Sequence, residues 1–293
     1  MKTRTKIWIG IGAFVMAGGG TADAGGFHPA KPLADTHALK NSAADTAIPH
    51  QAAHSIILAQ SKHGGEGGEN EGGEGGGGAK LPPDLDFAVK IAQMRGHLLV
   101  GDQLVKEGQW KAAHPHFLHP VEELYGGIRS RLREYKTPPF QSALKILANA
   151  VRDRKGGDEY GKALKTVMDA LNAADDGLRA KPLDWTSFSL EAAIETLKSS
   201  ANEYEEAIVK GRIAKPVEYQ DARGFILQAE KMIESVAPAL EKKDAEALKQ
   251  VRDGIAELKK AFPTAMPPKT PIKDYGTVLG DVSRIELAAG KLL

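Results

Sequence analysis

Apolar residues recur at intervals of three and four along most of the chain after residue 83, which is the spacing of amphipathic helices. The first such stretch begins at Asp84, which follows two prolines and is placed to cap a helix. Gly108 predicts where this helix ends. Its apolar positions are Phe87, Ile91, Met94, Leu98, Leu99, Leu104 and Val105.

The same periodicity predicts further helices, separated by proline and glycine signals. They cover about residues 121–135, 140–151, 158–175, 190–211, 216–233, 245–262 and 275–291. Alternating β-branched runs bounded by turns, which indicate strands, are nearly absent. The sequence therefore predicts an all-α protein made of antiparallel helical bundles.

Two helical halves are expected, residues 84–176 and 186–293. In each half a long helix closes with a similar short segment, residues 104–108 in the first and 208–211 in the second, and another helix follows. A duplicated helical hairpin is one interpretation of this shared order, and two unrelated hairpins are the other. Either pair would pack as one elongated bundle or as two joined bundles.

Residues 1–24 have the pattern of a secretory signal peptide. Three basic residues precede an apolar run over residues 7–17, and an Ala-Asp-Ala cleavage pattern ends at Ala24. The apolar run is too short for a membrane span, which needs roughly 20 residues. We therefore expect cleavage after Ala24 and a periplasmic or secreted protein, with an uncleaved membrane anchor as the alternative.

Residues 25–83 have the composition of a disordered linker. Gly, Ala, Ser, His and Pro dominate, and residues 63–78 are nearly all Gly and Glu. Glycine this dense cannot repay the entropy lost on ordering, so a flexible acidic linker is expected. Loose cation binding by His63 and the neighbouring glutamates is the alternative.

Charge and cysteine content exclude several functions. The formal net charge is +1, and removal of residues 1–24 takes away three basic residues and one acidic residue, which leaves −1. A near-neutral protein is a poor partner for nucleic acid. The absence of cysteine excludes disulfides, thiolate metal sites and thiol catalysis. No later apolar run is long enough to predict a transmembrane segment in the mature chain.

All nine histidines lie before residue 120, and four of them fall in or beside one predicted helical hairpin. Imidazoles gathered near carboxylates are the donors that iron, copper and zinc accept. A helix beginning at His114 would place His116, His119 and Glu123 on one stripe, facing the helix that carries His97. The candidate metal ligands are His97, His114, His116, His119, Glu122 and Glu123.

Two prolines support a second interpretation of this segment. Proline is tolerated in the first turn of a helix and disturbs it further inside. With Pro115 and Pro120 nearby, the helix could begin only at Pro120. Glu122 and Glu123 would then be ordinary first-turn acids, which the helix dipole favours, and the histidines would decorate an exposed loop.

A weaker candidate lies at the corresponding place in the second half. Its polar residues could bind a hard cation, but a solvated helix end is the favoured interpretation. The group comprises Glu203, Tyr204, Glu205, Glu206, Glu218, Tyr219 and Asp221.

Part of this second half resembles a known family. The run from Tyr204 to Gly211, followed by Pro216-Val217-Glu218-Tyr219 and Ala222, is similar to the extracytoplasmic helical segment of bacterial oxidase-coupled iron permeases. The resemblance covers about residues 190–235. It implies a periplasmic helical module associated with iron or another transition metal. The membrane helices and the R-E-x-x-E iron motif of those permeases are absent here, so the resemblance does not imply transport itself.

Two functions follow from the sequence as hypotheses. The first is an exported protein that binds or handles a transition metal through the histidines, with an envelope protein such as a metal transporter as its partner. The second is a non-catalytic helical interaction module of the cell envelope without a metal site. An enzyme is the less favoured expectation, since histidine is missing from most of the fold and no Ser/His/acid set can be assembled.

Overall fold

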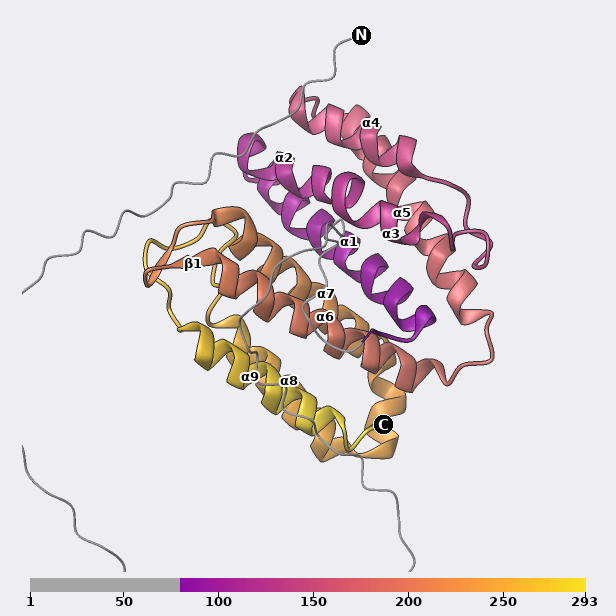
Figure 1. Ribbon diagram of the computed structural model, residues 1–293, viewed down its shortest axis with the longest axis vertical. Coiled ribbons are helices and arrows are strands. Elements are labelled where there is room, and N and C mark those ends of the chain that lie inside the picture. Colours follow the sequence, from indigo (N-terminus) through magenta and orange to yellow (C-terminus); the bar gives the residue numbers. More distant parts are fainter. Residues whose placement is uncertain (1–79) are drawn as a thin grey trace, which may run out of the picture. The chain divides into compact units, whose positions relative to one another are not determined.

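The computed structural model describes residues 80–293, so the predicted signal peptide (1–24) and nearly all of the predicted linker (25–83) lie outside the described residues. The described chain is helical almost throughout, and the prediction of an all-α bundle is confirmed (Figure 1). The elements are α1 (Pro83–Lys106), α2 (Trp110–His119), the π-helical turn η1 (Pro120–Leu124), α3 (Tyr125–Arg129), α4 (Gln141–Arg152), α5 (Gly157–Arg179), α6 (Trp185–Ala207), β1 (Ile208–Val209), β2 (Arg212–Ile213), α7 (Pro216–Lys243), α8 (Ala245–Lys259) and α9 (Tyr275–Ala289).

Helix α1 is central to the packing. It contacts α2 on one side and α6 and α7 on the other, so it lies between other helices of the first half and the helices of the second (Figure 1). Many of its side chains are buried, including the polar ones of Gln93 and His97. A helix that is buried nearly all round is expected in the middle of a bundle rather than at its surface. Polar groups on α1 are therefore enclosed by neighbouring helices.

The apolar side chains form two cores. The first lies among α1 to α5 and the start of α6 and includes Phe87, Phe117 and Leu171. The second lies among α6 to α9 and includes Tyr204 and Phe262. Helices α6 and α7 pack along each other, and α8 and α9 cover them on the side away from α1 (Figure 1). The predicted halves, 84–176 and 186–293, remain an interpretation, because all the described residues belong to one compact unit.

Two glycines allow α1 and α7 to approach closely. A Cβ atom on Gly224 would lie 2.3 Å from the carbonyl oxygen of Gly96, and a Cβ atom on Gly96 would lie 2.6 Å from a ring carbon of Phe225. Real Cβ atoms cannot come this near, so only glycine fits at the contact. The two backbones therefore meet directly where α1 crosses α7.

The turns that close α1 and α6 differ, although their sequences are similar. Gly108 has a φ of +72°, and the N–H groups of Gly108 and Gln109 donate to the carbonyls of Val105 and Leu104, which is the Schellman arrangement. In contrast, Lys210 and Gly211 both have positive φ and join the two-residue strands β1 and β2. Local sequence similarity thus produces a helix cap in one half and a hairpin in the other.

The structure corrects the boundaries expected around the histidines. Helix α2 begins at Trp110, earlier than either start considered above, and helical structure ends at Arg129 rather than about Tyr135. The N–H of Tyr125 donates to the carbonyl of Pro120, five residues back, which is the π-helical pattern. Pro120 has no N–H to continue an α-helix, and the chain accommodates it with one wide turn.

Among residues 80–293, every helix is either too short or too polar to cross a membrane.

Candidate metal centre

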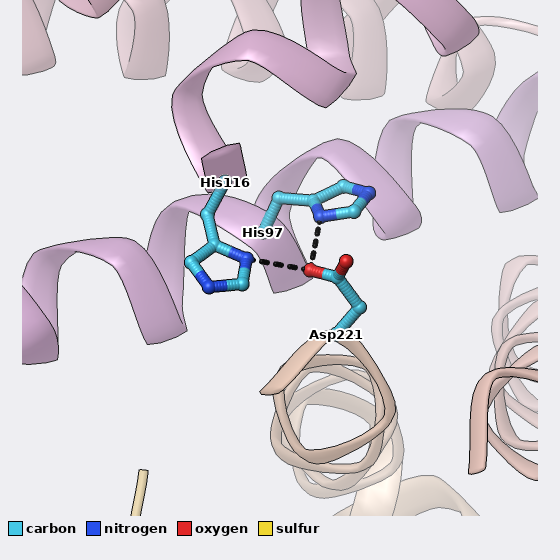
Figure 2. A group of neighbouring side chains, drawn as sticks. All are labelled: His97, His116 and Asp221. Carbon is cyan, nitrogen blue, oxygen red and sulfur yellow. Dashed lines mark hydrogen bonds and ion pairs between the residues drawn. The ribbon is translucent and has the colours of Figure 1, made fainter. Parts of the chain in front are cut away.

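Four side chains from three helices converge where α1, α2 and α7 meet. Nδ1 of His97 and Nδ1 of His116 lie 2.6 Å and 2.7 Å from the same oxygen, Oδ1 of Asp221 (Figure 2). Nδ1 of His119 lies 3.1 Å from the other oxygen, Oδ2. The three rings therefore point at one carboxylate instead of spreading into solvent. His97 comes from α1, His116 and His119 from α2, and Asp221 from α7.

The glycine crossing places His97 against Asp221. Gly96 precedes His97 on α1, and Gly224 lies one helical turn after Asp221 on α7. Because the backbones touch there, a histidine and a short aspartate can reach each other across the helix interface. The ring of Phe225 packs edge-on against the His97 ring with centroids 5.0 Å apart, and it fixes one side of the imidazole.

A similar close approach positions α2. A Cβ atom on Gly101 would lie 2.7 Å from the ring of Phe117 and 3.2 Å from Cβ of His116. Glycine at this point of α1 lets α2 lie close enough for His116 to extend to Asp221. His119 lies one turn further along α2 and reaches the same carboxylate from its outer side.

The inner part of the group is shielded from water. The side chains of His97 and His116 are fully buried and that of Asp221 is 1% exposed, whereas that of His119 is 20% exposed. Burial lowers the pKa of His97, and Asp221 only partly offsets this. Burial also opposes ionisation of Asp221, but attraction to His97 and His116 and hydrogen bonds from the rings hold its pKa well below the usual range. Asp221 is therefore an anion that accepts from the histidines.

The Nε2 atoms of the two buried imidazoles have different surroundings. Nε2 of His97 is buried and has no hydrogen-bond partner among the described residues. Nε2 of His116 lies 2.9 Å from Oε1 of the buried Gln220. A buried ring nitrogen without a partner is unfavourable, and sites that retain one commonly have a chemical reason for it.

More carboxylates surround this group. Oε2 of Glu123 lies 3.8 Å from Nδ1 of His119. Burial, followed by the negative charges of neighbouring acids, raises the pKa of Glu203 to about 8; these acids are Asp221, Glu206, Glu218 and Glu123. Burial and the charge of Asp221 also raise the pKa of Glu218. The outer side of Asp221 therefore faces an excess of acidic side chains.

Not all of the predicted ligands belong to this group. His114 lies on α2 but has Arg152 and Asp153 near the end of α4, together with Glu122, as its charged neighbours. Burial, followed by the charge of Arg152, lowers its pKa. Glu122 is exposed. The structure thus brings together His97, His116 and His119, with Glu123 at the edge, and places His114 and Glu122 elsewhere.

Asp221 is the residue whose importance the sequence did not reveal. The sequence places it among the acidic residues of the second half, for which a solvated helix end is the favoured interpretation. Its burial was the missing information, because nothing in the local sequence shows that α7 crosses α1 at this position. The one sequence feature that relates to this burial is the pair Gly96 and Gly224, each within three residues of a site residue. It can be interpreted only when the pairing of α1 with α7 is known.

The atoms of the inner group can hold a metal ion. One ligand atom each from His97, His116 and Asp221 lies within 4.8 Å of the others, and among residues 80–293 no other group of this kind is found. Bonds of about 2.0–2.2 Å to nitrogen and oxygen separate ligand atoms by roughly 3.3 Å. The present separations of 2.6–2.7 Å are those of proton-bridged pairs. A cation in place of the protons would require these donor atoms to move apart by less than about 1 Å.

Residues 180–293, which cover α6 to α9, match the family model of the iron permease-associated 4-helix bundle domain. The match confirms the resemblance found over residues 190–235 and extends it to the end of the chain. It includes Asp221 but not the three histidines, which come from α1 and α2. No curated protein and no solved structure matches the chain.

Proposed function

We propose that this protein is an exported helical protein that binds or handles a transition metal ion. His97, His116 and Asp221 supply the ligands, and His119 and Glu123 lie at the outer edge. The observation that carries the proposal is the convergence of two fully buried imidazoles on one buried carboxylate oxygen, 2.6 Å and 2.7 Å away. A metal ion would use the same three atoms.

The donor set limits the kind of ion. Two imidazole nitrogens and one carboxylate oxygen form a set that suits Fe(II) and Zn(II), and Cu(II) where a planar arrangement is reached. The absence of thiolates makes a Cu(I) site less suitable. Iron is favoured by the match of residues 180–293 to a domain associated with iron permeases.

The acidic surroundings support a cation rather than a purely structural network. Asp221 already carries a negative charge, and further carboxyl groups, those of Glu203 and Glu218, have raised pKa values because burial and neighbouring acids oppose their ionisation. Like charges held together in a partly buried region are unfavourable unless a cation or a proton compensates them. A bound divalent ion supplies that compensation.

Location and partner complete the proposal. The signal pattern of residues 1–24 supports export to the periplasm, and the permease-associated domain supports a metal transporter of the envelope as the partner. The protein would then receive or deliver the ion outside the membrane.

Metal loading of the full chain, purified without an affinity tag, tests the proposal. The protein is stripped with a chelator, exposed to Fe²⁺ without oxygen or to Zn²⁺, desalted and analysed for bound metal. We expect the wild type to hold one equivalent more than the double variant His97→Ala/His116→Ala. The comparison is made within the full chain because five further histidines precede residue 80 and can bind ions weakly.

His114→Ala is the matched control, since it removes a histidine from the same helix without touching the converging group. It should keep the extra equivalent. Circular dichroism should show that all variants retain their helices. Equal metal content in the wild type, the double variant and the control would contradict a metal centre at this position.

A second candidate function is a helical interaction module without a metal. The observation that favours it is on α9, where Leu279 and Leu287 are 42% and 67% exposed and lie two turns apart. If this is the functional surface, a Leu279→Glu/Leu287→Glu variant should lose a cross-linked envelope partner while its metal content stays unchanged. Retention of the partner by that variant would exclude this surface.

A further inference from the structure

A cavity lies apart from the converging histidines, among α1, α5, α6 and α7. Its volume is about 170 Å³, enough for a small molecule rather than a single water. Apolar walls come from residues such as Ile91, Phe188 and Met232. Polar and charged residues line the remainder, so the cavity has an apolar part and a polar part, which is the usual composition of a ligand site.

The charged residues around the cavity carry an excess of positive charge. Arg95, Arg179 and Lys231 line it, and Asp175 is the one acidic residue in its lining. Arg95 is already paired, because its Nη2 lies 2.7 Å from Oδ2 of Asp175. Arg179 and Lys231 form no ion pair with any described residue. The lining therefore holds two cations outside any ion pair of the described residues, although the charge of Arg179 also acts on Asp175.

The Arg179 side chain is held in place rather than free in solvent. Its guanidinium carbon lies 4.2 Å from the centroid of the Trp185 ring, in a cation–π contact. The indole thus positions the guanidinium while leaving its N–H groups available. A guanidinium with a fixed plane is suited to binding a carboxylate through two parallel hydrogen bonds.

Two buried donors in the lining have no partner among the described residues. They are Oγ of Ser189, whose residue is 4% exposed, and Nε1 of Trp185. Serine in a helix commonly donates to the carbonyl four residues back, as Thr196 does to Ala192 at 2.7 Å. Ser189 makes no such bond. Buried donors without acceptors indicate that an acceptor from outside the chain belongs there.

We propose that this cavity binds a small organic carboxylate with a compact apolar body. The carboxylate accepts from Arg179, Lys231 and the buried donors, and the apolar body lies against Ile91, Phe188 and Met232. A metal ion is excluded by the positive charge of the lining. A fully apolar ligand would leave both donors unsatisfied. The site is independent of the proposed metal centre and makes no use of its ligands.

Nuclear magnetic resonance of the full chain tests the proposal with butyrate as the probe. The indole N–H signal of Trp185, assigned through a Trp185→Phe variant, reports on the cavity. We expect butyrate to shift this signal saturably, with millimolar affinity, because Arg179 and Lys231 are exposed to solvent. The neutral isostere butyramide should produce at most a tenth of the shift. Inorganic phosphate, which lacks an apolar body, should bind several times more weakly.

Substitutions then locate the binding. Arg179→Gln/Lys231→Gln changes two exposed side chains, so folding should be unaffected, and butyrate affinity should fall about tenfold or more. Ser189→Ala should weaken butyrate binding severalfold yet leave the free protein as stable as the wild type or more stable, because it removes an unpartnered buried hydroxyl.

Ser235→Ala is the matched control, since Ser235 lines the same cavity but already donates to the carbonyl of Met232 at 2.6 Å. It should bind butyrate as the wild type does. An absent or non-saturable shift, an equal response to butyramide, or unchanged affinity in the Arg179/Lys231 double variant would each overturn the proposal.

Discussion

Two buried aspartates in the segment that matches the permease-associated domain have opposite surroundings. Asp221 is 1% exposed and Asp281 is 2% exposed. The partners of Asp221 are the imidazoles of His97, His116 and His119. Asp281, on α9, instead pairs with Lys273 at 2.9 Å and with the guanidinium of Arg284. Equal burial thus occurs with two different kinds of partner.

The partners decide what each carboxylate can do. Lysine and arginine are permanent donors at neutral pH and have no lone pair to offer a metal ion. The Asp281 group is therefore closed, and its role is structural. An imidazole becomes a ligand as soon as its proton leaves. Under the proposed function the Asp221 group would exchange protons for a cation, whereas the Asp281 group has no nitrogen lone pair to offer one. Burial alone would not have distinguished them.

The largest expected effect comes from a substitution at the tight backbone contact between α1 and α7. Gly224→Ala places a methyl group 2.3 Å from the carbonyl oxygen of Gly96, so we expect a loss of about 3 kcal/mol in the free energy of unfolding, together with loss of metal binding. Gly280→Ala, beside Asp281, meets only an ordinary contact at 3.6 Å and should be neutral or slightly stabilising. Urea unfolding of both variants measures the difference. Equal stabilities would show that the crossing is not tight.

Neutralising each aspartate in turn should affect different properties, metal affinity for Asp221 and stability for Asp281. Asp221→Asn should weaken metal binding roughly 100-fold, since it removes a charged ligand. Asp281→Asn should leave metal affinity unchanged but lower the free energy of unfolding by about 2 kcal/mol, because Lys273 and Arg284 lose their shared counter-charge while remaining partly hydrated. Competition titration with a chromophoric chelator and urea unfolding provide the two measurements. Comparable metal affinities for the two variants would contradict a metal-binding role specific to Asp221.

The acidic residues around Asp221 should make the free energy of unfolding depend on pH. The folded state raises the pKa of Glu203 to about 8 through burial and neighbouring acids, above its value in the unfolded chain. Between these two pKa values the folded state binds the extra proton, so stability falls as pH rises toward 8. We expect the wild type to lose roughly 1 kcal/mol per pH unit between pH 6.5 and 8. Glu203→Gln should remove this slope.

The control for this prediction is Glu257→Gln, which changes a partly exposed residue of α8 that contacts Lys273. Hydrogen bonds from Lys260 and Lys273 lower the pKa of Glu257 to about 2, so it is ionised throughout this pH range in both states. Its removal should leave the slope unchanged. Thermal unfolding monitored by circular dichroism at several pH values gives the comparison, and a slope that persists in Glu203→Gln would assign it to another group.

The smallest effects concern the edge of the site. His119 is partly exposed and bonds to Oδ2 of Asp221, so His119→Ala should weaken metal binding about tenfold. His114→Ala should change it by less than about twofold, since that ring faces Arg152 and Asp153. The same chelator titration ranks the two variants. An equal loss in both would mean that the sequence cluster, and not the convergence on Asp221, determines binding.

Periodicity was sufficient to predict the helices and the all-α class. The apolar spacing from Phe87 to Val105 and the cap at Gly108 placed α1 to within two residues of its observed end. The region around Pro115 and Pro120 was not predictable in the same way. Tertiary packing there overrides the local cost of two prolines, and a π-helical turn absorbs the second one.

The site was predicted in part. Histidines that are close in sequence and joined by one turn can be brought together by a hairpin, and His97, His116 and His119 indeed converge. Their common partner lies 102 to 124 residues away. A carboxylate on a helix start has the same local sequence whether it faces water or another helix. Pairing between distant helices decides its burial, and one sequence does not reveal that pairing.

The contact between Gly96 and Gly224 also affects how an ion would leave. Because main chain meets main chain there, no flexible side chain can absorb a relative displacement of α1 and α7. Any sliding of one helix along the other would therefore change the distance between His97 and Asp221 directly. A docking protein that separated α1 from α7 would therefore release the ion without contacting any metal-coordinating side chain.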